Sequence, residues 1–235
     1  MLGERNNHVL GAAIREYIRT GHPVASRELA SRYRLHISPA TVRSSMLELD
    51  DLGYLEQPHT SAGRVPTDQG YRYFVDYLIP NAVLAAHEES LLEQVFAIDD
   101  EEEFLCSFGR TLAELTGAFT ATGSAEREFW YKTGLSGVLG EPELYSEEGM
   151  RLFGHLADDI EENITNLVES LAEDENVEQT FIGGENPLRG ARFCSMMVSS
   201  WHHPRGFDGL VVMVAPRRTN YEKHVAVLRR LKEQN

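Results

Sequence analysis

Cysteine, long apolar runs and a secretory leader are scarce or missing in this sequence of 235 residues. Its two cysteines, Cys106 and Cys194, lie far apart and belong to no set with metal-ligand spacing, so we expect neither a disulfide nor a zinc site. No apolar run approaches the roughly 20 residues that cross a bilayer, and no segment resembles a signal peptide. We therefore expect a cytoplasmic protein of one or two domains.

Positive charge is also scarce, because the formal net charge is −15. The first 80 residues contain nine arginines, no lysine and nine acidic residues, whereas residues 81–235 contain thirteen basic and twenty-eight acidic residues. The whole excess of negative charge therefore lies in the second part of the chain. Since such a body repels polyanions, any binding of nucleic acid depends on local contacts made by the first part.

A helix with a well-defined start is predicted after residue 37. The hydroxyl of Ser38 can cap the first turn, and Pro39 suits the first helical position because it has no amide hydrogen to leave unpaired. Gly53 is expected to end the helix. Asp50 and Asp51 lie near that end, where the helix dipole disfavours acidic residues, and the sequence offers no reason for them.

Successive residues of an α-helix are rotated by about 100° around its axis, and this rotation gives the predicted helix two different faces. Its apolar residues Val42, Met46 and Leu49 share one face, which is expected to pack against a core. Its polar residues Thr41 and Ser44 lie on the other face, with Arg43 at the flank. The second face is therefore free to meet a partner.

Two further helices and a wing complete a module of about 70 residues. Helices are predicted over roughly 6–20 and 26–33, the second capped by Ser26, with a tight turn over 34–37 before the third helix. A short strand and a polar tip over 54–66 follow it. Three helices followed by a wing are typical of a winged helix-turn-helix DNA-binding domain.

The candidate DNA contacts of the module can be assigned to bases or to the backbone from the chemistry of their side chains. Arg43 can donate a bidentate pair to guanine, and Thr41 and Ser44 can bond base edges or phosphates. Arg64 at the tip suits a phosphate or a narrow minor groove. The full set of expected DNA-binding residues is Arg27, Ser38, Thr41, Arg43, Ser44, His59, Thr60, Ser61 and Arg64.

The remainder of the chain predicts an α+β domain. A capped helix with aromatic residues is expected over 67–78, and two helices separated by an acidic run are expected over 84–117, suited to linking or dimerisation. Further on, we expect helices over 147–171 and 221–232 with a small antiparallel sheet. Its predicted strands are 119–123, 179–182, 193–201 and 210–215.

No catalytic, metal or cofactor site is expected. His202 and His203 are adjacent, so on a strand they point to opposite faces, and no carboxylate or thiol nearby has convergent spacing. The segment from Gly183 to Asn186 could bind a small anion through its amides, but it lacks the strand and helix of a phosphate loop. We interpret it as a turn with a specific hydrogen-bonding role.

Seven segments together resemble the HrcA family of heat-inducible transcription repressors. They read YIRTG at 17–21, PVASR at 23–27, SPATVR at 38–43, LGYLEQPHTSAGRVPT at 52–67, LAELTG at 112–117, GLSGVL at 134–139 and FIGGEN at 181–186. The resemblance implies a dimeric repressor that binds an inverted repeat at chaperone operons and leaves it on heat stress. It also implies a chaperonin as a possible partner.

The resemblance implies a division into three parts: a winged-helix DNA-binding domain over 1–80, a helical linker or dimerisation region over 81–118, and a reduced GAF-like domain over 119–235. The family carries an inserted dimerising subdomain, but this sequence passes almost directly from Ser124 to Phe129 where that insertion would lie. We therefore expect a shortened member of the family.

Two other classes of function are compatible with the sequence. The winged helix could dock another protein, in which case sequence-selective DNA binding would be absent. A regulator that senses a small ligand through its GAF-like sheet would share the DNA function but would be stabilised by that ligand. Nothing in the sequence identifies such a ligand.

Overall fold

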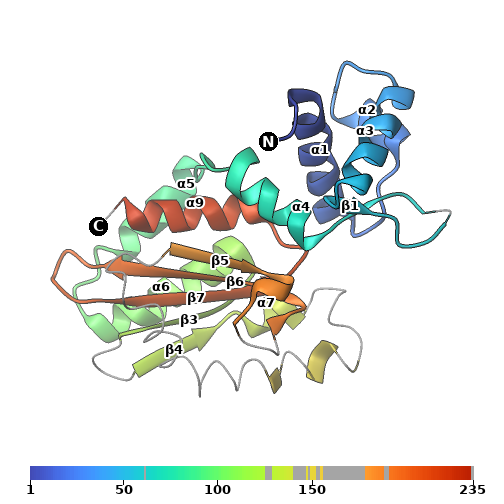
Figure 1. Ribbon diagram of the computed structural model, residues 1–235. Helices are drawn as coiled ribbons and strands as arrows, with labels where there is room; N and C mark the ends of the chain where they lie inside the picture. The colour runs from blue at the N-terminus through green and yellow to red at the C-terminus, as the bar shows by residue number, and fades with distance from the viewer. Residues whose placement is uncertain are drawn as a thin grey trace. The chain divides into compact units, whose positions relative to one another are not determined.

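The computed structural model describes residues 1–60, 62–124, 129–139, 147, 149–151, 154–155, 178–187 and 191–233. The chain divides into two compact units, Met1–Pro80 and Asn81–Asn235 (Figure 1). The first unit is mostly helical and the second contains an antiparallel sheet, so the protein has a mixed α+β fold.

Three helices form the core of the first unit: α1 (Glu4–Thr20), α2 (Ser26–Arg32) and α3 (Pro39–Asp51). The core consists mainly of aliphatic side chains that are less than 5 % exposed, among them Leu10, Ile14, Leu29, Val42 and Leu49. Their burial confirms the predicted apolar face of the third helix.

The predicted start of α3 is confirmed, and that of α2 is wrong. The hydroxyl of Ser38 accepts a hydrogen bond of 3.1 Å from the amide of Thr41, and Pro39 follows it as predicted. In α2, however, the N-cap is Ala25 and Ser26 is already helical, with no side-chain cap. Backbone bonds between Val24 and Arg64, of 2.8 and 2.9 Å, fix the chain just before this helix.

A two-stranded hairpin follows α3, with β1 (Leu55–Glu56) antiparallel to β2 (Val65–Pro66). The chain continues into α4 (Asp68–Tyr73) and a π-helical turn, η1 (Phe74–Leu78). Thr67 caps α4 by accepting from the amide of Gly70, and its own hydroxyl donates to the carbonyl of Gly53 at 2.6 Å. One threonine thus joins the end of the hairpin to the turn after α3.

The second unit contains a five-stranded sheet in the order β4-β3-β7-β6-β5, with every neighbouring pair antiparallel. Its strands are β3 (Phe119–Ser124), β4 (Phe129–Thr133), β5 (Glu178–Ile182), β6 (Cys194–His202) and β7 (Asp208–Pro216). The helical elements of this unit are α5 (Ala86–Val95), α6 (Glu101–Thr116), α7 (Leu135–Leu139), the 3-10 turn η4 (Gly183–Glu185) and α9 (Tyr221–Lys232).

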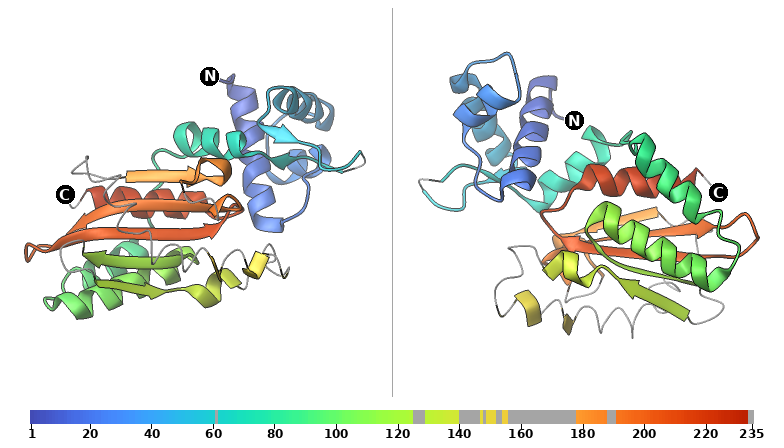
Figure 2. Two further views of the ribbon diagram at one scale, coloured as in Figure 1. Left: turned by 60° about the horizontal axis from the view of Figure 1, so that its bottom comes forward. Right: turned by 180° about the vertical axis from the view of Figure 1, so that it is seen from behind.

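The two central strands are buried on both faces. In β7, Val211 and Met213 point into the core shared with α5, α6 and α9, whereas Val212 and Val214 belong to the core on the opposite face. Figure 2 shows α6 and α9 lying along one face of the sheet. This double burial explains why β6 and β7 are almost uninterrupted apolar runs.

Most of the predicted elements of the second unit are present. The strands predicted over 119–123, 179–182, 193–201 and 210–215 are confirmed with small shifts, as is the helix over 221–232. Strand β4 was missed; its first residue pairs with the last residue of β3. Most of the helix predicted over 147–171 lies outside the described residues.

The acidic run after α5 has a local role. Asp100 caps α6 by accepting from the amide of Glu103, and the three glutamates that follow form the first turn, where the helix dipole favours acid. Helices α5 and α6, within the region where a linking or dimerising role was expected, pack into the core beneath the sheet.

Cys194 is buried, and both cysteines are free. Burial raises the pKa of the Cys194 thiol to about 12. Among the helices that the described ranges contain, none is long and apolar enough to cross a membrane.

Candidate nucleic-acid interface

The outward face of α3 carries the residues on which the candidate interface is built. Arg43 and Ser44 are exposed, and Thr41 is half-buried. Among the described residues, neither Arg43 nor Arg27 forms an ion pair, so both guanidinium groups keep their donors for a partner. The face presents hydrogen-bond donors on a rigid helix whose opposite side is buried.

A hollow of about 560 Å³ lies beside this face. It is bounded by α3, by the segment before α2 and by the loop of the hairpin. Its lining residues are Val24, Ala25, Ser26, Arg43, Met46, Leu47, Gln57, Thr60, Ala62, Gly63 and Arg64. The hairpin loop and α3 therefore form one continuous surface within the first unit.

Gln57 organises the loop of the hairpin. Its side-chain amide donates to the carbonyl of Thr60 at 3.1 Å and to that of Ala62 at 2.9 Å. His59 and Thr60 are exposed at the tip, and Ser61 lies outside the described residues. A single glutamine thus holds an exposed polar tip through main-chain contacts.

Gly63 allows the loop to return to the body of the unit. A Cβ atom at this position would lie 2.2 Å from the carbonyl oxygen of Val24 and 2.8 Å from the carbonyl carbon of Pro23. Only glycine permits that approach, and the approach permits the paired backbone bonds between Val24 and Arg64. The loop is therefore tied to the start of α2.

Arg64 occupies a different environment from the one expected at a tip. Its Nε atom lies 2.7 Å from Oδ2 of Asp50, and its side chain is only 13 % exposed. The pair explains why an acidic residue is tolerated in the last turn of α3. Whether Arg64 also contacts a phosphate remains a prediction.

Glu16 fixes the angle between α1 and α2. Its carboxylate is 1 % exposed, accepts from Arg19 at 2.6 Å and from the hydroxyl of Tyr33 at 3.1 Å, and lies 3.6 Å from Arg32. The Arg19 guanidinium lowers the pKa of this carboxyl, against the effect of burial, which raises it. Arg32 is thus partly engaged within the unit.

The turn between α2 and α3 is strained in two places. Arg34 and His36 have φ angles of 46° and 54°, in the left-handed region that non-glycine residues seldom adopt. Ser38 follows and is exposed while its hydroxyl caps α3. The tight turn sets where α3 begins.

Sequence reasoning missed Asp50, Gln57 and Leu47 as parts of this surface. Asp50 could be noticed in the sequence because the helix dipole disfavours an acidic residue near the C-terminal end of a helix. Leu47 could have been noticed because helical periodicity places it on the outward face. Gln57 carries no local signal, because its role depends on contacts that the hairpin makes only once it is folded.

The second unit holds two histidines with different surroundings. The side chain of His202, at the end of β6, is 44 % exposed, whereas His203 is 5 % exposed and stacks on Phe207 with ring centroids 4.1 Å apart. This arrangement agrees with the structural role expected for the pair. Asn186, in the turn interpreted as structural, donates to the carbonyls of Gly183 and Cys194, both at 2.9 Å.

The fold and this surface define a class of protein. It is an α+β protein with a helical first unit, in which an arginine-bearing helix lies beside a hairpin. The sequence profile of the HrcA protein C-terminal domain matches residues 77–225. The chain therefore belongs to the HrcA family.

Curated relatives match part of the chain. The heat-inducible transcription repressor HrcA of Moorella thermoacetica is 48 % identical over 117 residues, which are 49 % of this chain and 34 % of that protein. The protein of the same name from Thermosynechococcus vestitus is 48 % identical over 122 residues, 51 % of this chain and 35 % of that protein. The chain thus spans about a third of the length of the curated relatives it matches.

A solved structure shares the fold. The crystal structure of a hypothetical protein at 2.2 Å resolution aligns with a TM-score of 0.72 at 19 % identity, covering 100 % of this chain and 98 % of that one. This likeness concerns the fold alone.

Proposed function

We propose that residues 1–80 form a winged helix-turn-helix domain that binds double-stranded DNA. In this proposal α3 enters the major groove, about 12 Å wide, and the hairpin of β1 and β2 is the wing. The observation that carries it is the outward face of α3, where Arg43 and Ser44 are exposed opposite a fully buried apolar side.

The roles of the proposed contacts follow from their chemistry. Arg43 reads guanine through a bidentate pair, and Thr41 and Ser44 bond base edges or phosphates. Arg27, Ser38, His59, Thr60 and Ser61 contact the sugar-phosphate backbone and set the register. Arg64 acts first as a positioning residue, since its ion pair with Asp50 holds the wing against α3.

The proposed biological role is repression of transcription at chaperone operons; the curated relatives are named heat-inducible transcription repressors. Occupancy of an operator excludes RNA polymerase from the promoter and requires no catalysis. The proposed operator is an inverted repeat, bound by a homodimer so that each α3 meets one half-site. Such a regulator acts in the cytoplasm.

The second unit is proposed as the dimerising body, a reduced GAF-like domain over 119–235 with the helices of 81–118. Its excess of acidic residues opposes non-specific DNA binding. A single DNA-binding domain therefore has modest affinity for DNA, and the two domains of a dimer together have higher affinity. Heat releases the operator when the body loses a few kcal/mol of dimer stability, because domains of this size are only marginally stable. A chaperonin that maintains the active dimer is a further proposed partner.

The proposal is tested by fluorescence anisotropy with the full chain at fixed salt. The probes are a labelled duplex with the inverted-repeat operator of the family and a scrambled duplex of the same composition, each titrated at several temperatures. Selective binding that is lost on heating and recovered on cooling supports the proposal. Equal or absent binding to both duplexes rejects it and favours a winged helix that docks protein.

A further inference from the structure

A large apolar side chain stands on the outward face of α3, where the DNA proposal places polar contacts. Leu47 is 46 % exposed. At 100° per residue it lies between Arg43 and Ser44 and nearly opposite Ser45 and Leu49, which are buried. The position is therefore central to the face and does not belong to the flank of the core.

Leu47 also lines the hollow between α3 and the hairpin loop. Two neighbours in that lining, Met46 and Ala62, are apolar, and Arg43 and Thr60 are polar. The hollow that Leu47 lines is thus partly apolar and partly able to form hydrogen bonds. A duplex lying across the face would cover Leu47.

We infer that Leu47 is a specificity-determining residue that packs against the C5 methyl group of thymine in the major groove. The inference rests on the proposed DNA-binding function. The thymine methyl is the apolar group that the major-groove edge of a base pair offers, so an apolar side chain on a groove-facing helix selects for it.

Helix geometry limits where that thymine lies. Leu47 is four residues after Arg43, which is about 6 Å along the helix axis. That distance corresponds to between one and two base-pair steps of about 3.4 Å. The thymine is therefore within two base pairs of the guanine that Arg43 reads.

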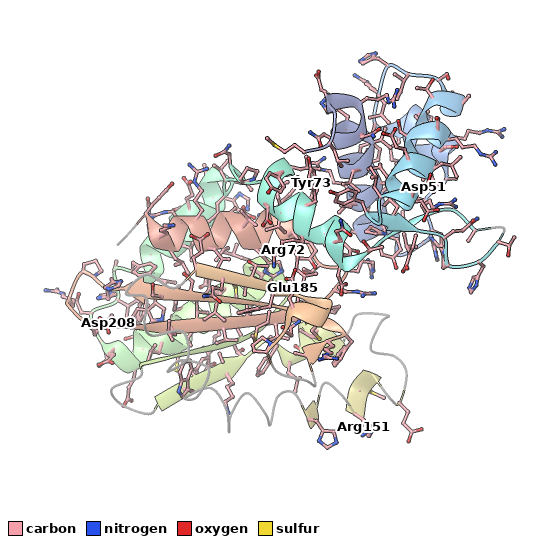
Figure 3. The ribbon with its side chains drawn as sticks, viewed as in Figure 1. Asp51, Arg72, Tyr73, Arg151, Glu185 and Asp208 are labelled. Atoms are coloured by element: carbon pink, nitrogen blue, oxygen red, sulfur yellow. The ribbon has the colours of Figure 1, made fainter. Side chains whose placement is uncertain are left out.

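The outward face changes character one turn later. Asp51, labelled in Figure 3, is the last residue of α3. At 100° per residue it lies on the same side of the helix as Leu47. Its carboxylate disfavours closer approach of the phosphates, so Leu47 is the last residue of the helix suited to a base contact.

Leu52 provides a matched control. It is 48 % exposed, close to the value for Leu47, yet it caps the end of α3 about 140° away around the axis and does not line the hollow. If simple surface hydrophobicity mattered, both leucines would behave alike. If the methyl contact matters, only Leu47 responds to the base.

The test is a double-mutant cycle between protein and DNA. Each thymine in one half-site of the operator duplex is replaced in turn by uracil, which differs only by lacking the methyl group. Anisotropy titrations compare the unaltered chain with Leu47→Ala, Leu47→Met and Leu52→Ala, and thermal melts check that every variant is folded.

The unaltered chain and Leu52→Ala should lose roughly three- to fivefold in affinity at one or two thymines, as expected for losing one buried methyl group. Leu47→Ala should bind thymine and uracil equally at those positions, and Leu47→Met should keep most of the difference. The same methyl sensitivity in Leu47→Ala, or none in the unaltered chain, overturns the inference and leaves the DNA function standing. Absence of operator selectivity in the unaltered chain overturns the proposed function itself.

Discussion

Nε of Arg64 lies 2.7 Å from Oδ2 of Asp50, and this ion pair joins the residue just before β2 to the last turn of α3. The two side chains are 13 % and 28 % exposed. The pair therefore couples the position of the hairpin to that of the helix whose outward face carries Arg43. It also neutralises an acidic residue at a helix end that would otherwise be unfavourable.

Breaking this pair should destabilise the first unit. Asp50→Ala leaves a largely buried guanidinium without its counter-charge, so we expect a loss of about 1–3 kcal/mol. Hydrogen exchange of peptides from residues 1–80 measures the loss. The control is Arg5→Ala, which removes an exposed pair with Glu48 and should change stability by less than about 0.5 kcal/mol. Equal effects of the two substitutions would show that the pair of Arg64 and Asp50 contributes no more to stability than the exposed pair of Arg5 and Glu48.

The glycine at the return of the hairpin should resist substitution. Gly63→Ala places a methyl group 2.2 Å from the carbonyl oxygen of Val24, so the loop must move and the backbone bonds between Val24 and Arg64 must weaken. We expect faster hydrogen exchange at both strands and weaker DNA binding. Gly154→Ala is the control, because its added Cβ meets nothing within 4 Å. Unchanged exchange in Gly63→Ala would contradict this account.

The second unit should lose stability in mild acid. Burial lowers the pKa of His224 to about 3, so its imidazole stays neutral in the folded unit above that pH, and burial also lowers the pKa of His203. Because the unfolded chain takes up these protons below about pH 6.5, stability is full above that value and falls as the pH drops. Each histidine contributes a slope of up to about 1.36 kcal/mol per pH unit.

Both tryptophans, Trp130 and Trp201, belong to the second unit, so their fluorescence in urea unfolding follows that unit alone. Most carboxyl groups are still ionised at pH 5, so measurements between pH 8 and 5 report mainly on the histidines. His224→Gln should reduce the pH dependence, because it removes the more deeply buried of the two imidazoles. A pH-independent midpoint in the unaltered chain would refute the assignment.

Contacts to the DNA backbone should be separable from contacts to bases. Arg27→Ala removes an exposed cation from α2, so we expect weaker binding to every duplex and a salt dependence reduced by about one ion. Titrations at three salt concentrations give that slope. A change in base preference with an unchanged slope would show that Arg27 reads sequence.

Local signals predicted much of the fold. Ser38 and Thr67 cap their helices as expected, since a cap needs only neighbours in sequence. The apolar runs of β6 and β7 marked buried strands. Ser26 misled the prediction, because a long-range backbone bridge fixes the chain before it. Strand β4 was missed, since three successive aromatic residues at 129–131 give no alternation.

The candidate surface was only partly predictable. Helical periodicity identified the face of Arg43 and Ser44, and their exposure agrees with it. The partner of Arg64 was not predictable, because Asp50 lies 14 residues earlier and meets it only when the hairpin folds back. Tertiary contacts of this kind decide which arginines remain available to a ligand.

The central claim is that the outward face of α3 reads base sequence, and Arg43→Ala tests it most directly. Anisotropy titrations at fixed salt give the ratio of affinities for the operator and the scrambled duplex, in the unaltered chain and in the variant. We expect Arg43→Ala to lose about 1–3 kcal/mol on the operator and much less on the scrambled duplex, so that the ratio falls at least several-fold. An unchanged ratio in the variant, or equal binding of both duplexes by the unaltered chain, would contradict the account.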